Sequence, residues 1–531
     1  MGLEHFPINE DLLYKFIEAN KKTFLPKKAK NKGGILINYS MVRMQIPWIM
    51  PKVLLAKGLE EKTDSSPVAV TWNRNDKLTD FFESYGVKHL SLNEECKKNI
   101  FGLIYAFYKT VCFVLFDGTG DGLKSLKMQG IKVGNNLYED ILRTSPLSTL
   151  RTCKNKVVIK KIVHLIWASH TLVRICKKYK IDFAITDDMA YHEGLFIKLF
   201  KKNGIRVIAG SNKSEKEVRL FKDGEVIRHN YVDVDDVRKE IQKYSFAQID
   251  WVDKYLEERF KGNNGREIDR QAFSGKRVLS KEELVEQFGI DPNKKTVVIM
   301  AHTFTDAVFN YGDYYFRDYY DWTKKTLQLA ANNSNCNWVL KPHPTRSSYN
   351  ESADSIEMMF DRYKKDNMFF LSDDISSESI KNIADVLITI GGNAGAEYAC
   401  FGIPAIIVGK PYYRGQGYTI EPSTYQEYEK YLLEIENINH LDKKQIENAK
   451  KVFYFKNSHA NSKNIFSDDF SCLLNKKYDD MISKMSLSYF KNNEGTEYYN
   501  DRALEAVIEY MSNNDIKETE YYCRGRDKIV D

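Results

Sequence analysis

The clearest structural signal in the chain is the segment Val386-Leu-Ile-Thr-Ile-Gly-Gly-Asn-Ala-Gly395, followed by Ala396-Glu-Tyr-Ala-Cys-Phe-Gly-Ile-Pro404 and Ala405-Ile-Ile-Val408. An apolar run leads into a glycine-rich turn, a short helix-forming segment and a second apolar run. Because parallel strands need a crossover connection, this order predicts a strand, a helix and a parallel strand. Three more apolar runs predict further strands of the same sheet, at 296–300, 338–340 and 368–371.

The N-terminal half of the chain repeats this alternation. A helix is predicted over 162–178 from its apolar spacing, and four apolar runs predict strands at 34–39, 68–72, 183–186 and 204–209. Strands that alternate with helices in this way form a parallel, doubly wound sheet. The sequence therefore predicts an α/β protein with two Rossmann-like domains that face a cleft.

The expected domain boundaries follow from a polar stretch between the two halves. The linker is predicted at 261–276, with an N-terminal domain over 1–265 and a C-terminal domain over 276–470. The remainder, 471–531, is expected to be a helical segment that packs back on the N-terminal domain.

Composition excludes several classes of protein. Lys and Arg number 79 and Asp and Glu number 73, so the formal charge is only +6 and nucleic acid is not an expected partner. No signal peptide is evident at the N-terminus, and the eight cysteines show no CxxC spacing, which is typical of reduced thiols in a cytoplasmic protein. The most apolar run, 101–116, is shorter than the ~20 residues that span a bilayer and is expected to be a buried helix.

Six lysines gather among residues 21–32. Such a cluster is usually a solvated arm of the chain. It also suits an electrostatic contact with anionic lipid or a polyanionic glycan, so a peripheral contact with the inner membrane or the capsule machinery stays open.

The residues that follow the predicted C-terminal strands form the strongest candidate site. Ligands of open α/β sheets bind beyond the carboxyl ends of the strands, so these residues meet at one edge. Glycines let a phosphate approach backbone N–H groups, while Lys, Arg and His add donors and positive charge. A nucleotide-phosphate site is therefore predicted from His302 and Thr303, from Lys341, His343, Pro344 and Arg346, and from Gly391, Gly392, Asn393, Gly395 and Glu397.

Two other segments have structural explanations that compete with functional ones. The Asp233-Val-Asp235 motif resembles a metal-binding Asp-x-Asp, but it precedes a charged helical segment and is expected to cap that helix. The aromatic run 311–322 either packs in the core or offers a stacking platform to sugar rings.

The strand-end residues also carry a resemblance to a known family. Lys341-Pro-His-Pro344 is similar to the His-Pro motif of GT-B glycosyltransferases that build bacterial capsules and related surface polysaccharides, among them Kdo transferases and bacterial sialyltransferases. The segment 391–405 resembles the part of these proteins where a glycine-rich turn leads to a Glu-bearing helix and a Gly-x-Pro strand. The resemblance covers roughly residues 130–415 and is looser before the linker.

The resemblance implies a GT-B fold and a role for each matching residue. His343 would contact the donor phosphate, while the 391–395 turn and Glu397 would hold the nucleotide, sugar or phosphate. A carboxylate of the N-terminal domain would act as general base on the acceptor hydroxyl.

The candidate bases follow the predicted strand 183–186. Adjacent carboxylates repel, which can raise one pKa toward the range that suits a base, although either Asp could instead cap the next helix. We favour Asp188, with Asp187, His192 and Glu193 as alternatives, and expect the acceptor near Tyr191, His192 and Glu193. The next glycine lies six residues after Asp188, unlike the acidic-acidic-Gly motif of sialyltransferases, so base and donor class stay open.

Together these observations predict a metal-independent glycosyltransferase that needs no cofactor. Its substrates would be a nucleotide-sugar, CMP-linked in the first instance, and a capsular or other surface glycan or glycolipid. Three alternatives stay open: a glycerophosphotransferase or other polymer phosphotransferase, a nucleotide-sugar epimerase of the same fold, and a non-catalytic capsule assembly protein.

Overall fold

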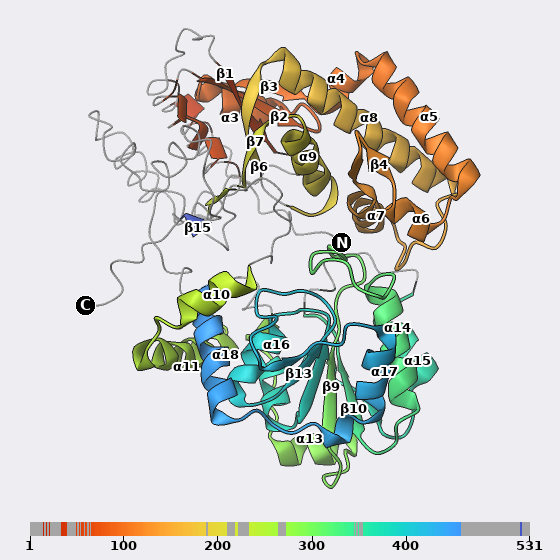
Figure 1. Ribbon diagram of the computed structural model, residues 1–531, viewed down its shortest axis with the longest axis vertical. Helices are drawn as coiled ribbons and strands as arrows, with labels where there is room; N and C mark the ends of the chain where they lie inside the picture. The colour runs from red at the N-terminus through yellow and green to blue at the C-terminus, as the bar shows by residue number, and fades with distance from the viewer. Residues whose placement is uncertain are drawn as a thin grey trace. The chain divides into compact units, whose positions relative to one another are not determined.

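The computed structural model describes residues 33–39, 65–186, 189–209, 218–220, 233–263, 272–344, 346, 349, 354–457 and 521–522, with single positions and short fragments between 14 and 63. These residues form two compact units (Figure 1). The N-terminal unit contains the described residues of 4–138, 152–227 and 459–531. The C-terminal unit contains those of 139–151 and 228–458.

The C-terminal unit is built on a six-stranded parallel sheet. Its strand order is β11 (Met368–Phe370), β10 (Asn337–Lys341), β9 (Thr296–Met300), β12 (Val386–Thr389), β13 (Ala405–Ile407) and β14 (Thr419–Ile420). Numbered along the chain, this is the order 3-2-1-4-5-6 of a Rossmann fold, which confirms the predicted fold class for this unit.

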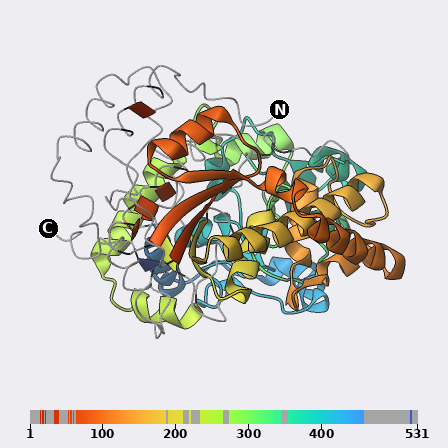
Figure 2. The same cartoon turned by 90° about the horizontal axis from the view of Figure 1, so that it is seen from above.

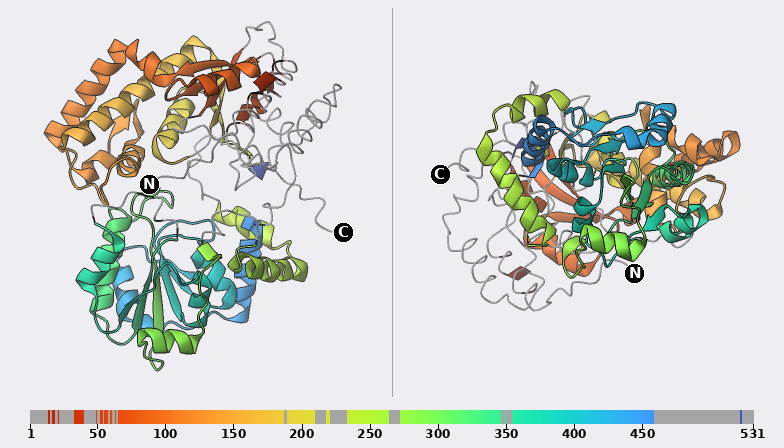
Figure 3. Two further views of the ribbon diagram at one scale, coloured as in Figure 1. Left: turned by 180° about the vertical axis from the view of Figure 1, so that it is seen from behind. Right: turned by 90° about the horizontal axis from the view of Figure 1, so that it is seen from below.

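Helices cover both faces of this sheet (Figure 3). One group contains α14 (Tyr319–Ala331), α15 (Ile356–Tyr363) and α17 (Tyr425–Leu433). The other elements are α10 (Val234–Ile241), α11 (Phe246–Phe260), α13 (Lys281–Phe288), α16 (Ala394–Glu397), α18 (Lys443–Asn457) and the 3₁₀ helices Ser377–Asn382, Tyr398–Phe401 and Ile435–Asn437. Trp322 and Trp338 are fully buried in the core of this unit.

Helices α10 and α11 group with the C-terminal unit, although the sequence boundary at 265 assigns them to the N-terminal domain. Their aromatic contacts give the physical reason. Trp251 of α11 packs edge-on against Tyr454 of α18 at 5.2 Å between ring centroids, and Tyr255 lies 5.9 Å from Phe453.

The N-terminal unit has a second sheet with a similar core. Its strand order is β15 (Tyr521–Tyr522), β8 (Val218–Leu220), β7 (Arg206–Ala209), β6 (Ile181–Thr186), β1 (Gly33–Asn38), β2 (Ser65–Thr71) and β3 (Lys88–Ser91). The five strands from β7 to β3 are parallel, and β8 and β15 add antiparallel pairings. The predicted C-terminal helix lies outside the described residues, apart from Tyr521 and Tyr522, which are a strand.

The helices of the N-terminal unit are seen from above in Figure 2. They are α3 (Asp76–Ser84), α4 (Leu92–Lys97), α5 (Ile100–Phe116), α6 (Gly120–Lys124), α8 (Lys156–Lys178) and α9 (Tyr191–Lys202). Helix α7 (Gly134–Arg143) follows a short hairpin of β4 (Lys127–Met128) and β5 (Ile131–Lys132). Its first half, up to Tyr138, groups with this unit, and its second half, from Glu139, groups with the C-terminal unit, which the predicted boundary at 265 did not anticipate. In the part of the chain that the structure describes, no helix combines the length and apolarity needed to cross a membrane.

One sequence expectation about this unit is wrong. The apolar run 101–116 does form a helix, α5, but the helix is not buried. Phe101 and Phe116 are 81% and 89% exposed, because α5 contacts α8 through its small residues and turns its large side chains outward.

The Asp-x-Asp motif caps a helix, as expected. Asp233 precedes α10, and its side chain accepts hydrogen bonds from the backbone N–H groups of Asp235 and Asp236. These bonds satisfy two of the unpaired N–H groups at the helix start.

The described cysteines are all free thiols. Cys96, Cys153, Cys176, Cys336 and Cys400 are buried, whereas Cys112 on α5 is partly exposed. Burial raises the pKa of Cys153 and of Cys176 to about 12.

His89 is a buried structural histidine on β3. Its Nε2 lies 2.7 Å from the hydroxyl of Thr71, and its Nδ1 lies 2.9 Å from that of Thr79. Burial, with a smaller effect of Arg74, lowers its pKa from 6.5 to about 4. The unfolded chain therefore binds the proton more tightly, so the stability that this histidine contributes is present above pH 6.5 and is lost as the pH falls toward 4.

We predict that His89→Gln weakens the acid sensitivity of the fold. At about pH 7 the variant should be less stable by roughly 1–2 kcal/mol, because hydrogen bonds are lost. At about pH 5 the difference in stability should shrink, because His89 is present only in the wild type and its protonation favours the unfolded chain. Urea unfolding at a series of pH values measures this, and an unchanged difference would contradict the assignment.

Candidate active site

The strand order places the candidate site at one point of the C-terminal sheet. β9 pairs with β10 on one side and with β12 on the other. The chain runs outward from β9 through β10 to β11 and then crosses over to β12 on the opposite side of β9, so the strand order reverses at β9. Ligands of open α/β sheets bind at such a switch point, beyond the carboxyl ends of the strands. His302 follows β9 and Gly391 follows β12, so two of the segments predicted to bind the nucleotide phosphate flank this point.

His302 lies against the glycine turn. Its Nε2 shares a hydrogen bond of 3.1 Å with Thr389 Oγ1, which also accepts the N–H of Gly392 at 3.3 Å. A Cβ atom built on Gly392 would lie 3.2 Å from Thr389 Oγ1 and 3.5 Å from His302 Cε1. Thr389, which the sequence did not single out, therefore joins the two loops at the switch point.

The two site histidines interact electrostatically. Burial, together with the nearby charge of His343, lowers the pKa of His302 to about 3. Burial also lowers the pKa of His343, against the opposing effect of the carboxylates of Asp306 and Asp373. Both imidazoles are therefore neutral near pH 7, so they offer one donor and one acceptor each instead of the positive charge expected from the sequence.

Aromatic side chains pack tightly around the glycine turn. A Cβ atom on Gly391 would lie 2.7 Å from the ring of Tyr311, and one on Gly395 would collide with the hydroxyl of Tyr413. That hydroxyl donates a 2.7 Å hydrogen bond to the carbonyl oxygen of Gly392. Packing alone therefore requires glycine at positions 391 and 395, and the approach of a phosphate to this turn stays a prediction.

The helix that follows the turn is short. α16 has only four residues and continues as a 3₁₀ helix, and the side chain of Asn393 at its N-cap makes no capping bond. A helix this short carries little macrodipole. A phosphate at this turn would therefore be held by individual backbone N–H groups.

The aromatic run 311–322 is mainly part of the core. Phe316, Tyr319, Tyr320 and Trp322 are buried, and α14 begins only at Tyr319. The ring of Tyr319 lies 4.7 Å from that of His302, so this core supports the histidine directly.

Two predicted phosphate ligands are engaged with protein groups. The ammonium of Lys341 donates 2.7 Å hydrogen bonds to the carbonyl oxygens of Ser372 and Ile375, and burial lowers its pKa to about 8. The guanidinium of Arg346 pairs with Asp373 at 2.8 Å and also with Glu357. Both side chains thus hold loops at the sheet edge, and their role toward a phosphate stays a prediction.

Glu397 is also paired. Arg259 of α11 donates to its Oε1 at 2.8 Å, and both side chains are buried. The pair connects α11 to the helix that follows the glycine turn. Glu397 therefore has a structural partner within the protein, and its contact with a nucleotide stays a prediction.

The loop after β9 has two features that are common at ligand sites. The buried hydroxyl groups of Thr303 and Thr305 have no hydrogen-bond partner among the described residues. Ala307 has a φ of 43°, a left-handed conformation that residues with a Cβ atom rarely adopt. Pro344, in the neighbouring loop after β10, follows His343 and is partly exposed.

The candidate bases lie at the corresponding point of the N-terminal sheet. Asp187 and Asp188 are outside the described residues, but they directly follow β6, which pairs with β1 at the switch point of that sheet. Tyr191, at the start of α9, has a φ of 52°, which is a genuine outlier for a bulky residue. Glu193 is buried on the same helix.

His192 has a partner that the sequence did not reveal. The indole N–H of Trp72 donates to His192 Nε2 at 3.2 Å, and the two rings meet edge-on. Because an indole nitrogen only donates, Nε2 is the unprotonated nitrogen and Nδ1 carries the hydrogen. The basic nitrogen of His192 is therefore occupied, which favours the carboxylates as bases.

Two further residues surround His343 that sequence reasoning did not assign. Lys276, at the end of the predicted linker, and Asp373, after β11, both act electrostatically on the imidazole. Burial lowers the pKa of Lys276. Their positions in the sequence gave no signal, because loops from distant strands bring them to one edge.

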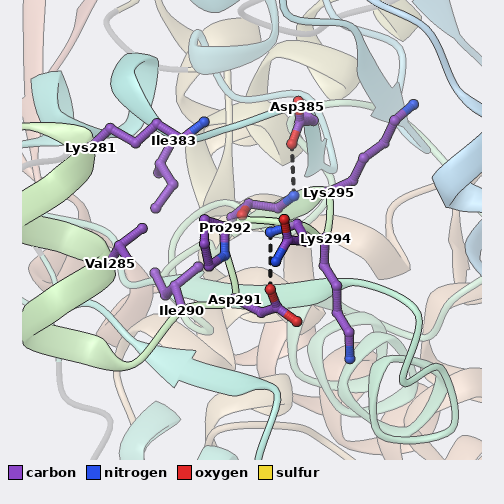
Figure 4. Close-up of a pocket in the computed structure, with 11 residues that line it drawn as sticks. Lys281, Val285, Ile290, Asp291, Pro292, Lys294, Lys295, Ile383 and Asp385 are labelled. Atoms are coloured by element: carbon purple, nitrogen blue, oxygen red, sulfur yellow. Dashed lines mark hydrogen bonds between the residues drawn. The ribbon is translucent and has the colours of Figure 1, made fainter.

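A shallow cavity of about 190 Å³ lies elsewhere on the C-terminal unit (Figure 4). It is lined by Asp291, Lys295 and Asp385, among others, and Asp385 accepts the backbone N–H of Thr296 at 2.8 Å. These residues lie where β9 and β12 begin, at the amino end of the sheet. Ligands of this fold bind at the opposite end, so we do not assign the site to this cavity.

These observations define a Rossmann-like α/β protein with a candidate anion site at the carboxyl edge of its C-terminal sheet. Residues 262–452 match the family model described as capsule polysaccharide biosynthesis protein. Over that segment the match confirms the resemblance predicted from the His-Pro motif and the glycine turn. No curated protein matches the chain in sequence.

Several solved structures are similar to the chain at low identity. The KpsC β-Kdo 2,4 transferase of Thermosulfurimonas dismutans is 13% identical, with a TM-score of 0.32 over 51% of this chain and 79% of that one. HepE of Anabaena, in complex with UDP-glucose, is 11% identical, with a TM-score of 0.27 over 80% and 94%. The UDP-GlcNAc 2-epimerase of Neisseria meningitidis is 11% identical, with a TM-score of 0.23 over 80% and 99%.

We predict that Arg259→Met destabilises the C-terminal unit by about 3–5 kcal/mol, because it leaves the buried Glu397 carboxylate without its cation. The double variant Arg259→Met/Glu397→Gln should recover part of this loss. Arg277→Met is the matched control, because Arg277 and Asp374 form an exposed ion pair and such pairs contribute only about 0–1 kcal/mol. Urea unfolding measures all three, and equal losses for the two single variants would argue against the pairing.

Proposed function

We propose that this protein is a glycosyltransferase of capsule or related surface polysaccharide biosynthesis. It transfers a sugar from a nucleotide-activated donor to a glycan or glycolipid acceptor. The proposal rests on one observation above all: His302 and the glycine turn meet at the switch point of the C-terminal sheet, within the segment that matches the capsule polysaccharide biosynthesis model. Backbone N–H groups beside neutral imidazoles suit the phosphate of a nucleotide.

The donor would be held by the C-terminal unit. The N–H group of Gly391 and the imidazole of His343 would donate hydrogen bonds to the phosphate. The N–H group of Gly392 would join them only by leaving its 3.3 Å hydrogen bond to Thr389 Oγ1. The unpaired hydroxyl of Thr303 is a further donor in the loop after β9. Hydrogen bonds from fixed donors stabilise the negative charge that grows on the leaving phosphate as the glycosidic bond breaks.

The acceptor would be activated by the N-terminal unit. The acceptor hydroxyl oxygen attacks the anomeric carbon, a new C–O bond forms, and the bond from that carbon to the phosphate oxygen breaks. Asp188 would take the hydroxyl proton, with Asp187 as the alternative. This scheme assigns every step to side chains and backbone groups of the chain itself and needs neither metal nor cofactor.

A CMP-linked sugar is the favoured donor. A CMP-sugar carries one phosphate, whereas UDP- and GDP-sugars carry two and place more charge in the site. Lys341 and Arg346 are engaged with protein groups, so the site offers hydrogen bonds more readily than uncommitted positive charge. This balance supports the monophosphate donor that the His-Pro motif suggests.

A donor panel tests the proposal. The full-length protein is incubated with CMP-, UDP- and GDP-sugars, with and without a capsular glycan acceptor, and the released nucleotide is measured. We expect CMP release that depends on the acceptor. Release of only UDP or GDP would contradict the donor assignment, a sugar isomer formed from donor alone would favour the epimerase, and binding without turnover would favour an assembly protein.

His343→Ala should abolish transfer, because it removes a hydrogen-bond donor aimed at the leaving phosphate. We expect a fall in kcat of roughly a hundredfold or more. His440→Ala is the matched control, since His440 is an exposed histidine of the same unit that pairs with Asp385 at 3.1 Å. Near-normal turnover by the first variant, with an intact melting transition, would exclude the assigned role.

Asp188→Asn tests the base. The variant should lose roughly 10²–10⁴-fold in kcat, and its rate should no longer fall as the pH drops through the pKa of the carboxylate. His192→Gln is the comparison, because its Nε2 already accepts the Trp72 indole and its loss should raise KM for the acceptor instead. A kcat loss confined to the His192 variant would reverse the two roles.

A further inference from the structure

Helix α5 differs from an ordinary surface helix, because it buries mostly small residues and exposes most of its large apolar side chains. The residues it buries are mostly small: Gly102, Ala106 and Thr110, with Phe113. Eight large apolar or aromatic side chains are exposed instead: Ile100, Phe101, Leu103, Ile104, Phe107, Tyr108, Leu115 and Phe116. Positions 101, 104, 108 and 115 fall on one helical stripe, so the exposed groups form a continuous surface along the helix.

Packing against α8 explains the small residues. A Cβ atom on Gly102 would lie 2.9 Å from His170 Nδ1, so glycine lets the two helices approach closely. Asn99 caps α5 and donates to Thr171 at 2.9 Å, and its carbonyl oxygen accepts the indole N–H of Trp167 at 2.8 Å. Figure 1 shows α5 along the outer side of α8, so α5 is held in place without using its large side chains.

Charge is distributed unevenly around this surface. Neither Ile100–Phe116 nor Lys156–Lys178 contains a single Asp or Glu. Two acidic residues lie just beyond the ends of α5 and already have partners: Glu95 pairs with Lys98 at 2.6 Å, and Asp117 accepts the backbone N–H of Thr119 at 3.0 Å. The two helices carry seven basic residues: Lys109, Lys156, Lys160, Lys161, Arg174, Lys177 and Lys178.

We propose that α5 and the basic residues of α8 form a docking surface for an anionic phospholipid bilayer. The large side chains of α5 enter the boundary between headgroups and acyl chains, and the lysines contact lipid phosphates. Helices with an apolar aromatic face and a basic flank lie in this way in the plane of the interface. Contiguous apolar surface of this kind on a soluble unit marks an interaction site.

The charges favour a bilayer over a second copy of the chain. Two copies that met through α5 would bring together two pairs of helices that carry basic residues and no Asp or Glu, and like charges across an interface oppose association. An anionic lipid surface provides both the apolar phase and the opposite charge. This inference does not depend on the proposed glycosyltransferase activity.

Flotation with lipid vesicles tests the proposal. The full-length protein is mixed with vesicles of phosphatidylcholine alone, or of phosphatidylcholine with phosphatidylglycerol, and the vesicle-bound fraction is measured after a density gradient. We expect binding to the phosphatidylglycerol vesicles that weakens as salt is added, because salt screens the lysine contacts. Absence of binding to these vesicles at low salt would overturn the proposal.

Variants separate the apolar and the charged contributions. F101Q/F107Q/F116Q should weaken partitioning roughly a hundredfold, because three phenylalanines no longer enter the lipid. These side chains are exposed, so the circular dichroism spectrum should not change. F246Q is the matched control, since Phe246 is 85% exposed on α11 of the C-terminal unit, and it should bind like the wild type.

The charge variant K156E/K160E/R174E should lose the preference for phosphatidylglycerol, whereas K239E on α10 should keep it. Equal binding of the triple phenylalanine variant and the wild type would overturn the proposal. So would a concentration-dependent dimer, seen by sedimentation, that the phenylalanine substitutions abolish while vesicles bind neither protein. That result would assign the surface to a second copy of the chain.

Discussion

The position of β9 between two parallel partners is the constraint on which the C-terminal unit depends. Its backbone hydrogen bonds set the register on both sides, with Lys341 opposite Met300 and Ile388 opposite Ile299. The loops after the three strands therefore leave the sheet at nearly the same level. His302, His343 and the glycine turn come from segments far apart in the chain, and this register is what gathers them at one edge.

The residues at that edge divide into those that hold loops and those that remain suited to a ligand. Lys341 and Arg346 satisfy carbonyl and carboxylate oxygens, and Glu397 is balanced by Arg259. Such buried or half-buried charges need partners, since an unpaired charge in the interior is strongly destabilising. The neutral imidazoles and the glycine backbone carry no charge that needs a partner, and these are the groups that we propose bind the phosphate.

The sequence predicted the strands and their edge well, because buried parallel strands are apolar runs followed directly by loop residues. Its failures concern partners that are distant in the chain. The Trp72–His192 bond joins residues 120 positions apart, and the Arg259–Glu397 pair joins residues 138 apart. The prediction that helix α5 is buried was wrong for a different reason. Its apolar content was correctly read as a helix, but composition does not say whether large or small residues face the neighbouring helix.

The partly exposed thiol of Cys112 makes α5 accessible to chemical labelling. Five of the six described cysteines are buried, and a thiol with a raised pKa has little of the reactive thiolate form. Among the described cysteines, a thiol-directed label should therefore attach first to Cys112, which lies on α5 four residues after Tyr108. A polarity-sensitive dye or a spin label placed there would report the surroundings of α5 in the native sequence.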